Sequence, residues 1–422
     1  MNDNKIDRKL SVSIIFFFII QSANSTIKTL LPDLGDAVNS LLSEVCGVLI
    51  LIMLFSCMRF VSRRSSMVMV SAYVIFIAVY FISIFQSILR NAPINVLLKE
   101  SMLWTMVWWL PMGLIIYSIR DKSVLYNTLV KWSYLLSIVT LLSVFSYFTA
   151  ITQMNQQLLD KGNYNMFFSY MLLLPLIIHL NEIFEHRGGK NYIWLIIEFV
   201  AILLYGSRGA LMCILAFLLM KVLLDRSSVG AKWGVIGFST VAVVAFVIGA
   251  NIVFQDLADV GLTSRTLEMF TEGTVSQSEG RERLMMYSID LIKDRPLFGY
   301  GLGGEFYVLY EKAYGVAKSG DFSSLTPHNG ILQLMLNFGF FIGGIISLLI
   351  IFTIPSIRKV KDEKARNLLI ILCAVYIIPS MTVGDGIFIK PGIALYFFLL
   401  LNNNKHQHNI RITYLNNEYC QC

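Results

Sequence analysis

The chain has 422 residues, of which 56% are hydrophobic and only 14% are charged, and its mean hydropathy is +0.66. A soluble globular domain carries about 25% charged residues, so this composition excludes an ordinary soluble protein. The net charge of +7 would suggest a nucleic-acid partner only as a patch on a soluble face, so we attribute it to membrane topology and expect no nucleic-acid partner.

Long apolar runs predict an all-α, polytopic membrane protein. Runs of about 17 to 25 mostly apolar residues can cross a bilayer as helices, which satisfy their own backbone hydrogen bonds. The first run follows three basic residues and resembles a signal peptide, but no small-residue cleavage site follows it cleanly, so we interpret it as a retained span. We expect about twelve spans, near residues 10–31, 41–58, 67–89, 101–119, 130–150, 164–180, 191–205, 208–224, 233–254, 330–353, 367–383 and 386–401.

The distribution of lysine and arginine predicts how these spans are oriented. When the segments between spans are alternated from a cytoplasmic N-terminus, the cytoplasmic side holds 21 of the 34 basic residues. Outside one long loop, the opposite side holds only six. Because cytoplasmic loops are enriched in Lys and Arg, both termini are predicted to be cytoplasmic.

The predicted organisation has four parts. Residues 1–254 carry the first nine transmembrane helices, residues 255–329 form one long, partly helical external loop, residues 330–401 carry helices ten to twelve, and residues 402–422 form a cytoplasmic tail. Loops of such length are uncommon unless they have a function. The chemistry is therefore expected in this loop and at the helix ends beside it.

Arg208 is the first candidate binding residue. Gly206 can end the preceding helix, Ser207 is a good N-cap, and Arg208 then falls in the first turn of a helix that begins on the outer side. Free backbone N–H groups, the positive end of the helix dipole and a guanidinium group together make an anion site. The alternative is an interfacial arginine that extends toward lipid headgroups.

A second group of basic residues lies in the long loop. The apolar spacing from Leu284 to Ile292 predicts an amphipathic helix on the membrane surface or on the helix bundle, with Arg281 and Arg283 at its start. The loop holds seven basic and eleven acidic residues, so its clustered arginines form a local exception that can attract a phosphate. The alternative is a solvated, charged helix.

Residues 296–304 are rich in glycine and formally contain the pattern G-x-G-x-x-G. We reject a dinucleotide site here, because no strand precedes the segment and no βαβ unit surrounds it. The segment is expected to be either a flexible turn or a loop whose glycines let the backbone approach a bulky ligand.

His328 is the candidate catalytic residue. Thr326 as N-cap and Pro327 as first helical residue predict a helix start, which places His328 in the first turn of the tenth span. The helix dipole disfavours the imidazolium and leaves a neutral ring that can accept a proton near pH 7. The alternative is a structural histidine at a helix end, yet His328 is the only one of the five histidines expected on the outer side.

These candidate residues share one side of the membrane. Arginine suits bidentate phosphate binding, and a neutral histidine suits general-base work on a hydroxyl group. The set therefore fits a lipid-linked diphosphate as substrate. No acidic cluster in the outer loop indicates a metal, and the arginines can neutralise the leaving group themselves, so neither a metal nor another cofactor is expected.

Four motifs, in this order, resemble the O-antigen polymerase and ligase superfamily of bacterial surface polysaccharide assembly. They are Ser207 to Ala210 at a span start, Gly280-Arg281, the segment 296–301 that follows, and Pro327-His328-Asn329 with Leu332, Gln333 and Gly339 after it. The resemblance is strongest over residues 200–350, and the hydropathy of the whole chain is compatible with it.

The resemblance implies a metal-independent, inverting glycosyltransferase at the periplasmic face of the bacterial inner membrane, acting on an undecaprenyl-diphosphate-linked oligosaccharide. Arg208 and Arg281 match the family's diphosphate-binding arginines, and His328 matches the histidine proposed to activate the acceptor hydroxyl. Arg283 is an alternative register for Arg281, because the Trp that the family often has four residues later is Met285 or Tyr287 here. Membrane lipid and a chain-length regulator protein are further candidate partners.

Three activities are compatible with this reading. We favour a polymerase, which joins the glycan to another lipid-linked repeat unit, over a ligase, which transfers it to the lipid A core; the preference is a family-level judgement. The non-enzymatic alternative is a transporter of a lipid-linked glycan. A functional ion pair between spans would favour transport, and Glu198 and Lys390 are the candidates for it; the alternative is that they simply lie near span ends. The gathering of charged groups at the outer surface disfavours transport.

Overall fold

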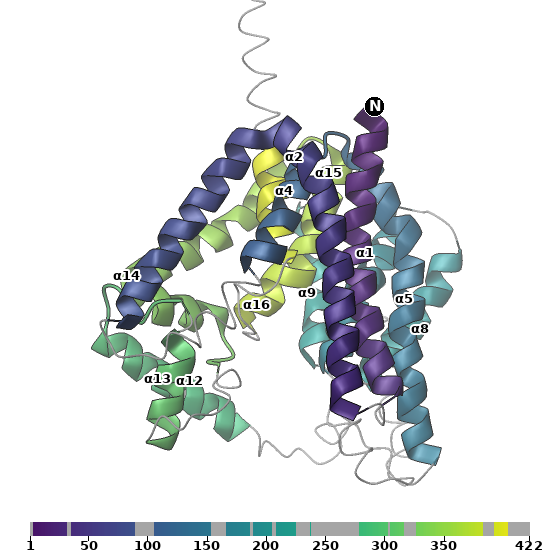
Figure 1. Ribbon diagram of the computed structural model, residues 1–422. Helices are drawn as coiled ribbons and strands as arrows, with labels where there is room; N and C mark the ends of the chain where they lie inside the picture. The colour runs from purple at the N-terminus through teal and green to yellow at the C-terminus, as the bar shows by residue number, and fades with distance from the viewer. Residues whose placement is uncertain are drawn as a thin grey trace, which may run out of the picture. The chain divides into compact units, whose positions relative to one another are not determined.

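The computed structural model describes most of the chain as helices. It describes residues 3–31, 35–88, 105–152, 166–185, 189–204, 208–224, 237, 278–302, 304–315, 326–382 and 392–403. Every regular element in these ranges is a helix, which confirms the all-α prediction for this part of the chain. Figure 1 shows the helices along the chain from α1 to the last turns after α16.

The described residues divide into two units. Unit 1 comprises Met1–Ser11, Leu54–Tyr126 and Arg281–Cys422, and unit 2 comprises Val12–Met53 and Asn127–Gly280. Each unit has its own packing.

Eleven of the twelve predicted spans coincide at least in part with described helices, and the ninth, 233–254, lies outside the described residues except for residue 237. Six helices are long and apolar enough to cross a membrane, and three shorter apolar helices accompany them. The long helices are Asp3–Leu30, Ala37–Gln86, Lys122–Val144, Phe167–Phe184, Gly330–Lys359 and Glu363–Thr382; the shorter ones are Val107–Ser118, Gly209–Leu224 and Gly392–Asn403.

The number of long helices is smaller than the number of predicted spans partly because helix α2 (Gly35–Ile88) covers both the second and the third predicted span. Its 54 residues would extend for about 80 Å at 1.5 Å per residue, far more than the hydrocarbon thickness of about 30 Å. The helix is broken at Ser65, whose φ and ψ are −147° and 35°. Helix α2 therefore consists of two helical segments that meet at a kink at Ser65.

A charged cluster in unit 1 lies at this kink. Arg64 binds the carboxylate of Asp3 at 2.7 Å and also that of the buried Asp7, and Arg120 reaches Asp3 at 2.9 Å. The Arg64–Asp7 pair is almost completely removed from solvent, so each charge needs the other to compensate its desolvation. The cluster ties the start of the chain to the α2 kink and to the turn that precedes α5 (Lys122–Thr152).

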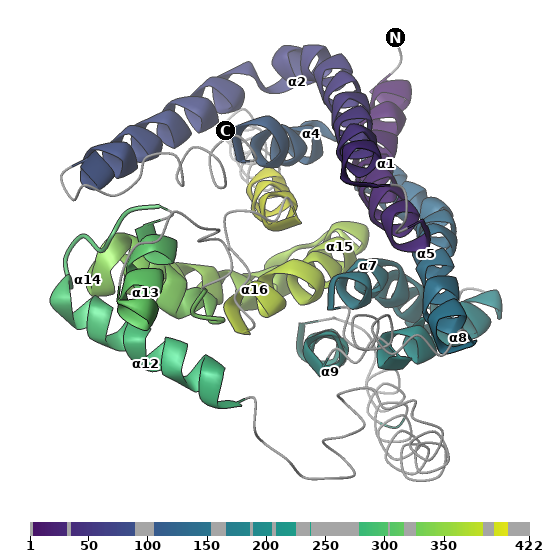
Figure 2. The ribbon, with the colours of Figure 1, turned by 60° about the horizontal axis from the view of Figure 1, so that its bottom comes forward.

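Unit 2 packs its helices through small polar side chains. In α5, four buried hydroxyl residues repeat on one face, and Thr140 forms a hydrogen bond of 2.5 Å with Ser22 of α1 (Asp3–Leu30). Small residues of this kind let membrane helices approach closely. The four residues are Ser133, Ser137, Thr140 and Ser143. Helix α7 (Met166–Phe184) lies beside α8 (Lys190–Leu204) and α9 (Arg208–Leu224) (Figure 2).

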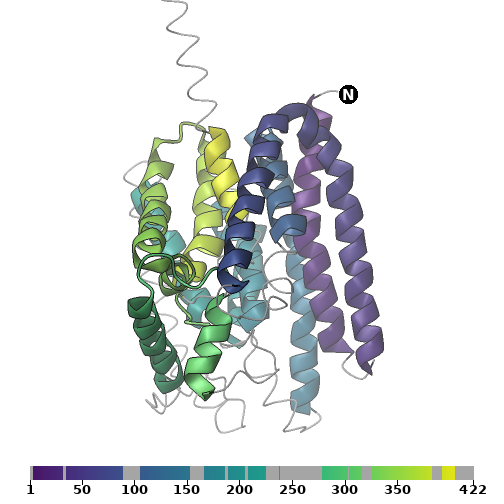
Figure 3. The same cartoon turned by 60° about the vertical axis from the view of Figure 1, so that its left-hand side comes forward.

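Unit 1 holds the helices of the C-terminal part. Figure 3 shows α14 (Gly330–Ser356) and α15 (Glu363–Leu372) as neighbours of the Gly392–Asn403 helix. Helix α15 continues through the short η6 (Cys373–Ile377) into α16 (Ile378–Thr382), which contacts α14. Two amphipathic helices, α12 (Ser278–Asp294) and α13 (Gly304–Tyr314), precede α14, so the loop predicted at 255–329 is partly helical where it is described.

Candidate active site

Helix α14, which follows His328, begins three residues later than the sequence suggests. The helix begins at Gly330, and its N-cap is Asn329, whose side-chain oxygen accepts hydrogen bonds from the backbone N–H groups of Ile331 at 3.0 Å and Leu332 at 3.2 Å. The prediction of Thr326 as N-cap and Pro327 as first helical residue is therefore wrong. An asparagine that satisfies two free N–H groups is as good a cap as any residue.

His328 consequently lies just before the helix instead of in its first turn. Its φ is +49°, and it is the only non-glycine residue with positive φ in the described part of the chain. Histidine adopts this region more readily than most residues, yet it still costs free energy, and such conformations concentrate at functional sites. The imidazole is partly exposed, and its Nδ1 atom lies 3.5 Å from the hydroxyl of Thr326.

The glycine-rich segment 296–304 packs against a break in α14. The backbone N–H groups of Tyr300 and Gly301 donate to the carbonyl oxygens of Leu336 at 2.6 Å and Asn337 at 2.8 Å. Gly339 breaks the helix with φ 84° and ψ 165°. The exposed carbonyls of the broken helix therefore receive their hydrogen bonds from the loop, as buried backbone groups require.

Glycine is needed here because backbone meets backbone. A Cβ atom at Gly339 would lie 2.5 Å from the carbonyl carbon of Leu297, and one at Gly299, whose φ is +56°, would overlap the backbone of Leu336. These glycines allow the glycine-rich segment and α14 to approach each other backbone to backbone. Hydrogen bonds hold the segment on two sides. The side-chain amide of Gln86 in α2 donates to the carbonyl oxygen of Phe298 at 3.3 Å, and the N–H groups of Tyr300 and Gly301 donate to α14.

Replacing Gly339 with alanine is expected to lower the free energy of unfolding by at least about 1 kcal/mol, because the φ and ψ of Gly339 are accessible essentially to glycine alone. The new methyl group would also overlap the backbone of Leu297. The measurement is the thermal midpoint of the purified protein in detergent. Gly344→Ala is the matched control: its Cβ would meet only the flexible end of Met335 at 3.5 Å, so its midpoint should stay the same or rise.

A buried carboxylate connects α13 to α14. Glu305, only 2% exposed, accepts a hydrogen bond of 2.9 Å from the side-chain amide of Gln333. The amide of Asn337 faces the same carboxylate and, oriented so that both of its donors are paired, also reaches the carbonyl oxygen of Gly301 at 2.9 Å. One carboxylate therefore fixes the first two turns of α14, the helix that follows His328.

Sequence reasoning missed Glu305, which it counted only among the acidic residues of the loop. A usable signal exists in α13 itself, where Glu305 shares the buried face with Phe306 and Leu309. A carboxylate on an apolar helix face is rare unless it has partners. Glu305 is thus a candidate for positioning the start of α14, which directly follows His328 and Asn329.

Helix α12 places Arg281 and Arg283 differently. Its buried residues include Ser288 and Ile292, and Leu291 joins the cluster formed with Tyr300, Leu309 and Leu336. Arg281 is exposed but lies at the edge of this packed face, since it precedes Ser288 and Ile292 by about two and three turns. Arg283 is two positions further on, and residues so spaced do not share a helix face.

Arg208 is the first residue of α9 in unit 2, as the sequence predicts. It belongs to a different unit from Arg281, Arg283 and His328, which lie in unit 1. The contacts within unit 1 bring together α12, α13, the glycine-rich segment and the first turns of α14. Arg208 belongs to unit 2, so it is not part of this group of contacts.

A buried acid–base pair lies in unit 2. Nδ1 of His179 in α7 and the carboxylate of Glu198 in α8 are 3.0 Å apart, and both side chains are 0% exposed. Ser137 of α5 donates to the same carboxylate, and Ser133 lies 3.0 Å from Nε2 of the imidazole. The ring of Tyr134 stacks on the imidazole at 4.6 Å. Glu198 is thus paired between two predicted spans, and the contact is an ion pair only while the imidazole is protonated. Lys390 lies outside the described residues.

Within the described ranges, no three His, Cys, Asp or Glu side chains are grouped so that they could hold a metal ion. The four described cysteines, Cys46, Cys57, Cys213 and Cys373, are free thiols. The described part of the chain therefore offers an imidazole just before α14 and a buried carboxylate–amide network that holds the first turns of this helix, while the two arginines lie at the start of α12.

Residues 193–347 match the family model described as O-antigen ligase. The matched segment begins in α8, includes Arg208 and α12, and ends in α14 after His328 and the break at Gly339. The match confirms the resemblance to the O-antigen ligase and polymerase superfamily, whose members are glycosyltransferase-like enzymes of polysaccharide assembly. No curated protein matches the chain.

Proposed function

We propose that this membrane protein is an O-antigen polymerase: an inverting, metal-independent glycosyltransferase that joins undecaprenyl-diphosphate-linked oligosaccharides at the periplasmic face of the bacterial inner membrane. The observation that carries the proposal is the placement of His328. It adopts a strained backbone conformation immediately before a capped helix, and that helix is fixed by Glu305, all within the segment that matches the O-antigen ligase family.

The proposed step transfers one glycosyl group. His328 accepts the proton of the acceptor hydroxyl as its oxygen attacks the anomeric carbon of the donor sugar, and the bond from that carbon to the diphosphate oxygen breaks. The leaving undecaprenyl diphosphate takes the bonding electron pair. Arg208 and Arg281, or Arg283 in the other register, bind the diphosphate and stabilise its developing charge, which makes a metal ion unnecessary.

The test is an assay of the purified protein in lipid vesicles with lipid-diphosphate-linked repeat units as both donor and acceptor. A polymerase produces a ladder of longer lipid-linked glycans, resolved by size. A ligase produces no ladder under these conditions; when lipid A core is added, it transfers the glycan to this core. A protein inert under both conditions is not the proposed transferase.

Transport of a lipid-linked glycan is a second candidate function, and the His179–Glu198 pair favours it. Ionisable residues inside membrane helices are rare, and they often mark proton or substrate pathways. The pair is electrically balanced whether its shared proton resides on the imidazole or the carboxylate, which is a property that proton-coupled transport can use.

Glu198→Gln distinguishes the two functions. Glutamine retains the shape of the side chain and can still bond to a neutral His179 and to Ser137, but it cannot exchange a proton. For the transferase we expect glycan extension within about twofold of wild type, because the reacting groups are elsewhere. For a transporter, movement of a fluorescent lipid-linked glycan across the vesicle membrane under a proton gradient should be lost, with Ser137→Ala as the control that keeps the acid–base pair.

A further inference from the structure

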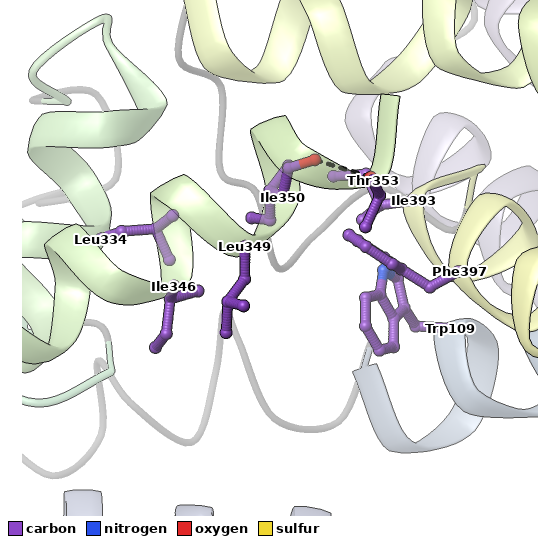
Figure 4. Close-up of a pocket in the computed structure, with 8 residues that line it drawn as sticks. All are labelled: Trp109, Leu334, Ile346, Leu349, Ile350, Thr353, Ile393 and Phe397. Atoms are coloured by element: carbon purple, nitrogen blue, oxygen red, sulfur yellow. Dashed lines mark hydrogen bonds between the residues drawn. The ribbon is translucent and has the colours of Figure 1, made fainter. Parts of the chain in front are cut away.

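Unit 1 contains an apolar groove on the side of α14 that faces the last helix. Its volume is about 280 Å³. One wall is formed by α14, from Leu334 through Ile346 to Leu349, and the other by Trp109 and by Ile393 and Phe397 of the Gly392–Asn403 helix (Figure 4). The hydroxyl of Thr353, its main polar side chain, donates to the carbonyl oxygen of Ile350 at 2.6 Å, so this wall presents hydrocarbon.

Two irregular features of the helices contribute to the groove. The break at Gly339 lets Leu334, before it, and Ile346, after it, line the same space. Trp109 is the last residue of η3 (Thr105–Trp109), a π-helical turn, and such turns are often found at functional sites. Within the described part of the chain, the buried indole nitrogen of Trp109 has no hydrogen-bond partner, although a buried indole usually has one.

The groove is open to the lipid phase along α14. Leu349 is 61% exposed, and in a membrane-spanning helix an exposed leucine faces hydrocarbon. Water is a poor occupant of an apolar space, so the natural occupant is a lipid chain. A volume of about 280 Å³ is about nine times the 30 Å³ share of a liquid water molecule. If each carbon atom of a chain takes about the space of one water molecule, the groove holds about nine carbon atoms, or roughly two five-carbon isoprene units.

The position of the groove selects among lipids. Leu334 lies on the first turns of α14, six residues after His328, so a chain in the groove would have one end close to the candidate active site. We propose that the groove binds the isoprenoid segment nearest the diphosphate of the lipid-linked donor; this inference rests on the proposed function. The double bonds of an isoprenoid also offer weak acceptors to the indole N–H of Trp109, which a saturated acyl chain lacks.

The proposal predicts how turnover depends on the length of the donor's isoprenoid chain. In the wild type, kcat/KM should rise at least tenfold from a donor without isoprene to one with two units, and then change little for longer chains. In Leu349→Trp, whose indole would fill the groove, this rise should disappear, while the donor without isoprene is used as well as by wild type. If Leu349→Trp does not fold, the smaller aromatic side chain of Leu349→Phe serves the same purpose.

Leu348→Trp is the matched control, because Leu348 is also exposed, at 53%, but does not line the groove. It should keep the wild-type dependence on chain length. Equal behaviour of the two tryptophan variants, or an equal loss for all donors in Leu349→Trp, overturns the assignment of the groove and indicates that bulk lipid fills it. Failure of the wild type to use any donor would instead contradict the proposed function.

Discussion

Replacing His328 is expected to abolish glycan extension while leaving the protein folded and inserted in the membrane. A general base contributes about 10²- to 10⁴-fold to a rate, so a variant without the imidazole should fall at least about 100-fold in kcat for the assay with lipid-linked repeat units. The loss should be in kcat, because the base acts on the acceptor hydroxyl in the transition state and contributes little to donor binding.

The choice of substitution matters because His328 has a φ of +49°. Alanine at this position removes the imidazole but also adds backbone strain of about 1–2 kcal/mol, which confuses a catalytic effect with a structural one. Asparagine tolerates the left-handed region and cannot act as a base, so His328→Asn is the decisive variant. If it retains wild-type turnover, His328 is a structural residue at a helix end and the general-base proposal is wrong.

Asn329→Ser is the matched control on the adjacent residue. Serine is also a good N-cap, so the helix should still begin at Gly330 and the variant should keep most of its activity. Asn329→Ala removes the two bonds to Ile331 and Leu332 and should reduce stability by about 1 kcal/mol. A large activity loss in Asn329→Ser would show that the geometry of this turn, and not the imidazole alone, limits turnover.

The helical content and most spans could be predicted because membrane helices have a strong, local signal. A run of apolar residues is sufficient for that prediction, as in α7 and α14. The kink at Ser65 could not be predicted in this way, because serine by itself does not mark a break, and the Arg64–Asp7 pair beside the kink joins residues 57 positions apart. The helix start at Gly330 was missed since Thr326-Pro327 and Asn329 are competing cap signals three residues apart.

The candidate site was predictable only in part. Arg208, Arg281, Arg283 and His328 stand out from the sequence because charged residues are rare in this chain and these four lie at predicted helix starts. Glu305 does not stand out, because its importance comes from burial and from its partners Gln333 and Asn337, which lie 28 and 32 residues away. The apolar face of α13, which Glu305 shares with Phe306 and Leu309, could have indicated its burial, but its distant partners leave no pattern in the sequence.

The glycine-rich segment shows the same limit. Its positive-φ glycines were correctly expected to permit close approach, but sequence could not indicate what approaches. Gly299 and Gly301 have φ values of 56° and 82°, and the segment fits against a break in α14 that is itself created by a glycine far along the chain. That the segment packs on α14 is therefore a feature that only tertiary packing reveals, and the approach of a ligand to it stays a prediction.

Replacing Arg281 with alanine is expected to reduce kcat/KM at least about 100-fold, whereas Arg283→Ala should stay within about threefold of wild type. The reason is the geometry of α12: Arg281 lies at the edge of the face that packs on Tyr300 and Leu336, and Arg283 does not share that face. Loss of one preorganised donor to a developing negative charge typically costs about 10²- to 10³-fold. The two variants remove the same charge from the same helix turn, so a general electrostatic effect of the loop cancels in their comparison.

Arg281→Lys refines this test, because an ammonium group retains the charge but cannot make two parallel hydrogen bonds to a diphosphate. If the contact is bidentate, lysine should recover only a small part of the activity lost in Arg281→Ala, and the defect should appear with every lipid-linked donor. If Arg283→Ala proves to be the damaging variant, the diphosphate lies on the opposite face of α12 and the register with Arg283 is the right one. Equal, modest losses in both alanine variants would mean that α12 attracts the substrate through its overall charge and that neither arginine binds it directly.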